Sequence, residues 1–169
     1  MGRRYNVHSY QHGVGLSGPV ASIATDPFMD LKNKEVIGYE VSKNIDSELC
    51  KRALANALAP RGRHKGLVLH SDCGSQYSSR AYKSMLAENG IEGSMSAPGC
   101  PYDNSCVESF FATLKKELTF RRKSATIEAV KTDRCRYIEL FYSRKRLHRP
   151  LGYMRPVVYR LATSIYFQR

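Results

Sequence analysis

Two carboxylates and a lysine occupy positions from which they could act together on a phosphodiester. Asp72 follows the short apolar run 66–71, and Glu108 lies at the start of an amphipathic helical pattern. The gap between them is 35 residues long (73–107), and Lys115 follows Glu108 by about two helical turns. Carboxylate oxygens hold the divalent cations that activate the attacking oxygen in phosphoryl transfer. The pattern suggests metal-dependent chemistry on nucleic acid, which needs a third carboxylate.

Each of these residues also has a purely structural interpretation. Asp72 could be a turn aspartate that accepts backbone hydrogen bonds before the next helix. Glu108 would suit the positive end of a helix dipole, and Lys115 could be a solvated cation. Asn104 shares the helical face of Glu108 and Lys115, where it could position substrate or cap the helix.

Several ordered sequence motifs surround these residues and resemble one family. They are similar to the second-frame transposases of the IS-three group, which have the D,D,E integrase core. The motifs are His70–Tyr77, Ser94–Ser96, Tyr102–Asn104, Glu108–Lys115 and Phe141–Tyr153. The resemblance covers residues 30 to 160.

The resemblance implies an RNase H-like fold and Mg²⁺- or Mn²⁺-dependent cleavage and joining of DNA strands. Asp72 and Glu108 would be the catalytic metal ligands. Insertion-sequence ends and target DNA would be the partners of a homo-oligomer. The residues implied to contact DNA are Asn104, Lys115, Arg144, Lys145, Arg146 and Arg149.

The first acid of the family pattern is missing from its expected strand. Aligning the strand at 35–41 with the family places the first strand near residues 5–14, which contain no Asp or Glu. Asp30 aligns with an aspartate that ends the second strand and is not catalytic in the family. Asp26 would serve only if the first strands were rearranged. The first catalytic Asp is therefore unassigned, and this chain alone is expected to show little or no activity.

The charge distribution supports a nucleic-acid partner. The formal net charge is +12, and 12 lysines and arginines against 4 acidic residues lie between Lys115 and Arg149. Phosphate backbones attract such a surface, although a basic face kept for solubility is the simpler alternative. Five cysteines without a CxxC pair indicate a reduced, cytoplasmic chain, with the cysteines as buried apolar fillers. No apolar run has the length of a membrane span.

The elements that must position these residues follow from apolar periodicity and capping signals. Strands are predicted at about 20–29, 35–41, 67–69 and 91–95. Helices are predicted from Asp46 to Pro60, from Ser79 to Ala87, and at about 103–118. A last helix at about 127–143 would direct inward Ile127, Val130, Ile138 and Phe141. This order predicts an α/β fold with a mixed sheet flanked by helices, and His70 packed beside Asp72.

The sequence thus divides into a poorly matching segment at 1–25, an integrase-core-like domain at 26–160 and a tail at 161–169. We expect a transposase core that is truncated or altered at its amino end. The alternatives are a non-catalytic DNA-binding remnant and a structural partner of an active transposase. A first-strand Asp encoded upstream in another reading frame would mark a frameshifted gene.

Overall fold

The computed structural model describes residues 5–9, 12–14, 23–60, 66–96, 105–119 and 126–165 of the chain. Its centre is a six-stranded sheet in which β5 has parallel partners on both edges and β3 has only antiparallel ones. The α/β architecture with a mixed sheet is therefore confirmed. The strands are β1 (Tyr5–Ser9), β2 (His12–Val14), β3 (Ile23–Asp30), β4 (Val36–Ser42), β5 (Leu67–Ser71) and β6 (Glu92–Met95).

The first predicted strand, at 5–14, consists of two segments. Both β1 and β2 pair antiparallel with β3, and β1 also pairs in parallel with β5, Ser9 lying opposite Ser71. Neither segment pairs with Asp26 or Pro27 of β3. The pairing of β3 with β1 and β2 is therefore interrupted at these two residues. Proline has no N–H to donate to a sheet, so Pro27 loses no N–H hydrogen bond by lying at this interruption. β1, which lies between β3 and β5, thus contains no acidic residue.

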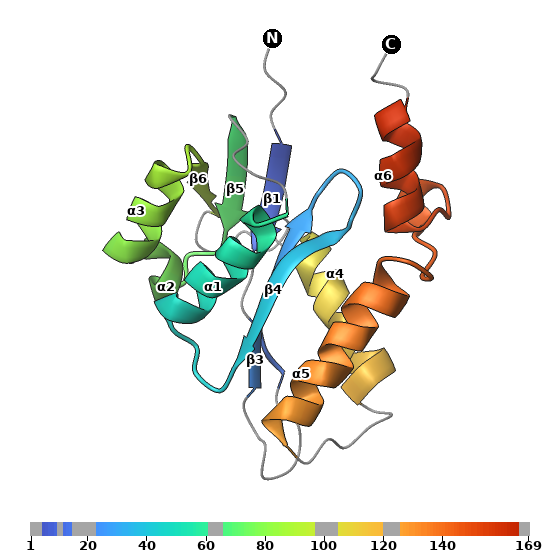
Figure 1. The fold of residues 1–169 in the computed structure, drawn as a ribbon, viewed down its shortest axis with the longest axis horizontal. Helices are drawn as coiled ribbons and strands as arrows, with labels where there is room; N and C mark the ends of the chain where they lie inside the picture. The colour runs from blue at the N-terminus through green and yellow to red at the C-terminus, as the bar shows by residue number, and fades with distance from the viewer. Residues whose placement is uncertain are drawn as a thin grey trace.

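Helices cover both faces of the sheet (Figure 1). One face carries α1 (Ser47–Leu58), α2 (Ser75–Ser78) and α3 (Arg80–Glu88). The other carries α4 (Ser105–Leu114), the π-helical segment η2 (Lys115–Thr119), α5 (Ile127–Arg136) and the π-helical segment η3 (Tyr137–Tyr142). The 3₁₀ turn η4 (Arg149–Leu151) and α6 (Pro156–Ile165) follow.

Side-chain caps fix the starts of three helices. Asp46 accepts a hydrogen bond from the backbone N–H of Leu49 at 2.8 Å, and Ser79 accepts one from Tyr82 at 3.3 Å. Both predicted caps are thus confirmed. Thr126 does the same for α5 through the N–H of Ala129. Each of these bonds satisfies one of the amide groups that a helix leaves without a partner in its first turn.

Adjacent residues of β3 point into two different cores. Phe28 packs with α1 and α3 in one cluster, and Met29 packs with α4 and η3 in the other. This alternation is the period of two of a strand covered on both sides. The helix α1 lies so close to β4 that a Cβ at Gly38 would be 2.5 Å from Ala57 Cβ. Glycine at position 38 therefore sets the helix–sheet spacing.

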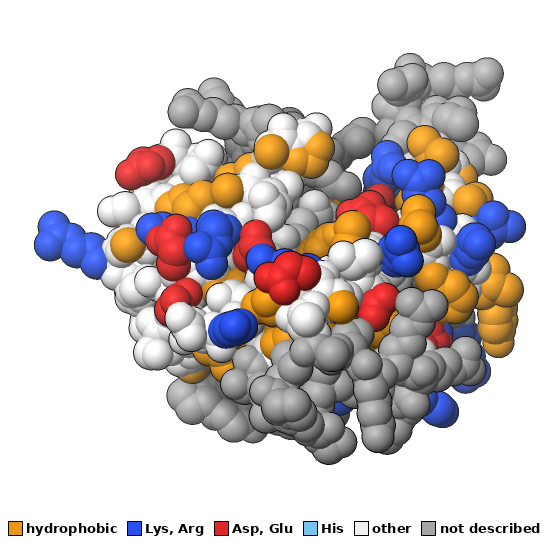
Figure 2. Space-filling view, turned by 60° about the horizontal axis from the view of Figure 1, so that its bottom comes forward, with side chains coloured by type: hydrophobic (Ala, Val, Ile, Leu, Met, Phe, Trp, Pro, Cys, Tyr) orange, Lys and Arg blue, Asp and Glu red, His pale blue; other side chains and the backbone are white. Residues whose placement is uncertain are grey.

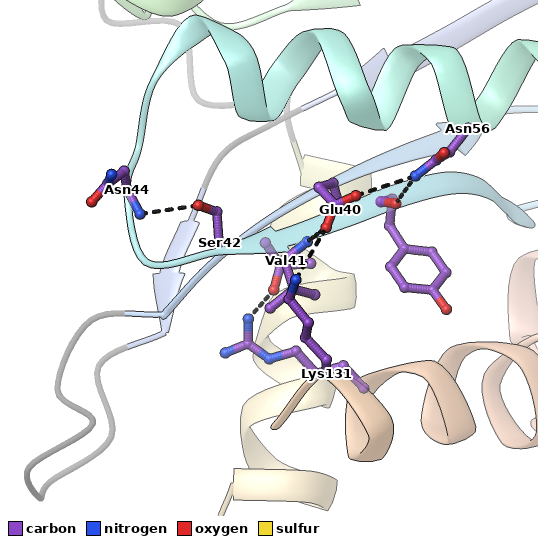
Figure 3. Close-up of polar contacts among 9 residues, drawn as sticks. Glu40, Val41, Ser42, Asn44, Asn56 and Lys131 are labelled. Carbon is purple, nitrogen blue, oxygen red and sulfur yellow. Dashed lines mark hydrogen bonds and ion pairs between the residues drawn. The ribbon is translucent and has the colours of Figure 1, made fainter. Parts of the chain in front are cut away.

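The edge strand β4 is covered by side chains rather than by another strand (Figure 3). Glu40 Oε1 accepts the N–H of Val41 at 3.0 Å, and Asn56 of α1 donates to the carbonyl of Tyr39 at 3.0 Å. Lys131 of α5 lies 3.8 Å from the same Glu40 oxygen. These contacts occupy outward-facing backbone groups that an edge strand otherwise offers to another chain.

The two predicted C-terminal helices depart from the prediction where they become π-helical. Val130 and Ile138 are buried as predicted, but Phe141 is 41% exposed, so its inward orientation is wrong. The i→i+5 bonding of a π-helix rotates the later residues away from the α-helical pattern. Tyr142 takes the buried position instead. α6 was not predicted, and it crosses residue 160, where the tail was expected to begin.

Candidate active site and nucleic-acid interface

Asp72 lies directly after β5, at the carboxyl end of the strand, where open α/β sheets place their ligand sites. Its Oδ1 accepts the N–H of Gly74 at 2.9 Å, so the turn interpretation holds as a structural role. Burial raises the pKa of Asp72 above its usual range, and the Gly74 hydrogen bond opposes that rise. A partly desolvated carboxylate of this kind would gain from a cation placed beside it.

His70 lies beside Asp72 in sequence but connects strands. Its Nδ1 lies 3.0 Å from Ser94 Oγ and its Nε2 lies 2.9 Å from Ser96 Oγ. Both ring nitrogens therefore face hydroxyl groups of β6 and of the residue that follows it. The side chain thus joins β5 to β6, whereas the prediction was that it packs beside Asp72.

Glu108 and Lys115 lie in the helical layer that covers the face of the sheet opposite α1. Glu108 is exposed in the first turns of α4, and Lys115 begins η2. Phe111, on the helical face predicted to contain Glu108, is only 1% exposed. Glu108 therefore borders the buried stripe of α4, as the helical pattern indicated. Asn104 lies outside the described residues.

The alternation of side chains along β5 indicates on which face of the sheet Asp72 lies relative to Glu108. Leu67 and Leu69 point into the α1 side, so the alternation directs Val68 and His70 towards the side that carries α4, and continuing it one residue past the strand would direct Asp72 there as well. The alternation therefore favours one face for Asp72 and the helix of Glu108. Within the described part of the chain, no three His, Cys, Asp or Glu residues form a group that could hold a metal ion.

Asp26 is directed to the other face of the sheet. It is fully buried, shares the side of Phe28, and accepts a hydrogen bond from the Tyr77 hydroxyl at 2.7 Å. Burial raises the pKa of Asp26 to about 7, the negative charge of Asp72 adds to the rise, and the bonds from Tyr77 and Cys50 oppose it. The charge of Asp72 thus affects the pKa of Asp26, although the side chain of Asp26 points away from the face that carries α4.

Asp30 is placed no better than Asp26 to join Asp72. It lies at the end of β3 opposite Val7, whose partner in β5 is Leu69. Leu69 is three residues before Asp72, which is about 10 Å along the strand at the usual rise per residue. Its Oδ1 accepts the N–H of Lys32 at 2.8 Å in the turn that follows. Asp30 therefore closes the turn between β3 and β4.

The four predicted DNA-binding cations after η3 separate into two groups. Arg144 and Lys145 are exposed, whereas Arg146 forms an ion pair with Glu117. Arg146 and Arg149 line one groove, together with Lys34. On the face shown in Figure 2, lysines and arginines are interspersed with acidic and hydrophobic side chains. The positive charges visible on that face therefore do not form a continuous patch.

Sequence reasoning missed two buried polar residues. Arg134 is 3% exposed and donates to Thr25 Oγ1 and to the carbonyl of Ile23, and burial lowers its pKa to about 10. The other is Tyr77, the partner of Asp26. In the sequence, Arg134 is one of the 12 basic residues of the Lys115–Arg149 segment. A basic residue in the α5 stripe, four residues after Val130, was the available signal.

The cysteine prediction holds only in part. Cys50 is buried, but Cys73 and Cys135 are exposed, so the interpretation as buried fillers is wrong for these two. Cys73 lies in the turn after β5 and donates to the carbonyl of Ser96 at 2.7 Å. Cys135 lies on the outward side of α5. Among the described residues, no helix is long and apolar enough to cross a bilayer.

The sequence matches two family models, both described as an integrase core domain, over residues 19–101 and 89–156. The chain is 39% identical over 128 residues to the transposase InsF for insertion sequence IS3A of Escherichia coli. It is 35% identical over 128 residues to the transposase for insertion sequence element IS904 of Lactococcus lactis. Each alignment covers 76% of this chain, and 44% and 51% of the relatives, so the chain spans about half of their length.

Solved structures show the same fold at low identity. The catalytic core domain of BIV integrase has a TM-score of 0.66 at 15% identity, covering 96% of this chain and 98% of that one. The HTLV-2 integrase catalytic core domain in complex with magnesium has a TM-score of 0.69 at 12% identity, covering 94% and 97%. The RNase H-like fold is thus confirmed. The chain belongs to the integrase-core family, and what it contains is the catalytic-core region of an IS3-type transposase.

Proposed function

We propose that this chain acts in DNA transposition by binding DNA, including insertion-sequence ends and target DNA, as part of a homo-oligomer. The observation that carries the proposal is an integrase-core fold whose basic excess lies between Lys115 and Arg149. Arg144 and Lys145 are the exposed cations of this segment nearest to the end of η3. Lys115, at the end of the helix that carries Glu108, would hold DNA near the reacting carboxylates.

We also propose that the chain does not cleave or join DNA by itself. Two metal ions, about 3.5–4 Å apart, need a shared carboxylate to activate the attacking oxygen and stabilise the leaving oxygen. Asp72 and Glu108 would be two ligands for Mg²⁺ or Mn²⁺. β1, the neighbour of β5 in which the first acid is expected, contains no acidic residue, and Asp26 is directed away from the face of α4. The carboxylates that the structure describes therefore do not fit the pair of metals.

Salt-dependent DNA binding is the test of the proposed function. We expect the logarithm of the affinity for a short fluorescent duplex to fall linearly with the logarithm of salt concentration. Replacing Arg144 and Lys145 by glutamine should weaken binding to different sequences by similar factors, since phosphate contacts are sequence-independent. The matched control removes two exposed positive charges from α3, through Arg80→Gln and Lys83→Gln.

Either of two results would contradict DNA binding by this segment. One is an affinity that does not change between low and high salt. The other is equal weakening by the variants of α3 and by those of Arg144 and Lys145. Loss of affinity for a single sequence would instead indicate that these side chains read base edges.

A further inference from the structure

A groove separates α4 from the turn that follows η3. Its volume is about 390 Å³. Cationic side chains line one part of it and hydroxyl groups of α4 line another, and no carboxylate is among its described lining residues. A groove of this composition is suited to an anion with several oxygen atoms. The residues that carry the argument are Lys34, Arg146, His148, Arg149, Ser105 and Ser109.

The cationic groups of the groove act on one another. Burial lowers the pKa of His148 below its usual range, the charges of Arg146 and Lys34 lower it further, and a hydrogen bond with the backbone of Tyr142 opposes this fall. The Nε2 atom of His148 is buried and has no hydrogen-bond partner in the part of the chain that the structure describes. The charges of Arg146 and Lys34 near His148 indicate positive potential in this part of the groove.

Local structure positions two of these cations, through the backbone at Lys34 and through an ion pair at Arg146. Lys34 has a left-handed conformation, with φ of 61°, and its N–H donates to the carbonyl of Asp30 at 2.8 Å. The ion pair of Arg146 with Glu117, which also accepts the Tyr137 hydroxyl at 2.8 Å, orients the guanidinium. A guanidinium has five N–H donors, so one carboxylate does not exhaust them. The groove thus has preorganised donors.

The hydroxyl side of the groove lies on the flank of α4 next to Glu108, with Ser105 about 60° from Glu108 around the helix axis. Successive residues of an α-helix are about 100° apart around its axis, which places Ser109 about 100° and Thr113 about 140° from Glu108. Thr113 donates to the carbonyl of Ser109 at 2.8 Å. Ser105 and Ser109 are exposed and have hydroxyl groups that can donate to an oxygen anion.

We infer that this groove binds a phosphate group of the DNA backbone. The inference rests on the proposed DNA-binding function and adds a site whose described lining residues include neither Asp72 nor Glu108. Arg149 and Lys34 supply charge, Arg146 supplies oriented donors, and the serines of α4 approach the same phosphate from the other side. A duplex held here lies along α4, so that its backbone is fixed relative to the helix that carries Glu108.

The experiment compares two groove variants with two matched controls, using the full chain and a short fluorescent duplex of arbitrary sequence. Arg149→Gln removes a groove cation, and Ser109→Glu places a carboxylate in the groove. The controls are Arg52→Gln on α1 and Ser84→Glu on α3, which make the same changes at exposed positions on the other face. Circular dichroism checks that all four variants are folded, and a titration with inorganic phosphate alone is followed by NMR.

We expect each groove variant to lower the DNA affinity about three- to tenfold at low salt and Arg149→Gln to reduce the salt slope by about 1, while the controls change little. Equal effects in groove and control variants, with DNA binding by the unmodified chain intact, would overturn this inference alone. Absence of DNA binding by the unmodified chain would overturn the proposed function as well.

Two further outcomes would assign the groove to another ligand and overturn the DNA assignment. One is saturable binding of inorganic phosphate that Arg149→Gln abolishes while DNA affinity stays the same. The other is a change in the oligomeric state of the groove variants, measured by sedimentation, without any change in DNA affinity. That result would indicate an acidic protein surface in the groove.

Discussion

Replacing Asp26 by asparagine should make the protein more stable at alkaline pH and should flatten the dependence of its stability on pH. Burial raises the pKa of this carboxyl from 3.8 to about 7. Between those two pH values, the folded protein binds a proton at Asp26 that the unfolded chain has released. The free energy of unfolding therefore falls as pH rises through this window, and the loss is complete above it.

The size of the effect follows from the change in pKa. Each unit corresponds to about 1.4 kcal/mol, so ionising Asp26 weakens the folded state by on the order of 4 kcal/mol between pH 3.8 and about 7. Asparagine carries no charge at any pH and keeps an oxygen that can accept the Tyr77 hydroxyl. We expect the variant and the unmodified protein to be similarly stable near the acidic end and to diverge as pH rises.

Urea unfolding followed by circular dichroism across this pH range measures the difference directly. The control is Asp30→Asn, which makes the same change at the partly exposed end of the same strand. Comparing variant with parent cancels the titration of the other carboxyls. Parallel stability curves for the Asp26→Asn protein and its parent would refute the reasoning, because they would show that Asp26 is not held neutral in the fold.

Two further substitutions test the packing described above. Gly38→Ala should destabilise the protein by about 2 kcal/mol or more, measured by urea unfolding, since its Cβ would lie 2.5 Å from Ala57 Cβ. Unchanged stability would show that α1 can move away from β4 at little cost. Arg134→Ala should lower stability by about 3 kcal/mol through the space it leaves and the loss of donors to Thr25 and Ile23. A midpoint equal to that of the unmodified protein would contradict the buried role of this guanidinium.

Much of the fold could be predicted because its signals are local. Asp46 and Ser79 are capping residues directly before apolar helical patterns, and each caps its helix in the structure. The apolar run at 67–69 predicted a strand, and β5 contains these residues. Period and capping therefore sufficed to place the elements around Asp72.

The parts that could not be predicted depend on contacts between distant segments. The burial of Asp26 results from Tyr77, which lies 51 residues away, and nothing near Asp26 in the sequence indicates it. The groove beside α4 combines Lys34 with cations more than 100 residues later, so the basic tail was recognised but its partner residues were not. The π-helical end of α5 also has no simple sequence signal, which is why Phe141 was placed on the wrong side.

A strand-transfer assay on DNA with recessed 3′ ends tests the central claim most directly. The claim is that the fold binds DNA while its carboxylates do not complete a catalytic site. The assay compares the chain with its Asp72→Asn form in Mg²⁺ or Mn²⁺, with an active IS3-type transposase as the positive control. We predict that neither form of this chain gives joined product above the background. Robust joining by the unmodified chain that Asp72→Asn abolishes would contradict the account and would show that another residue completes the site.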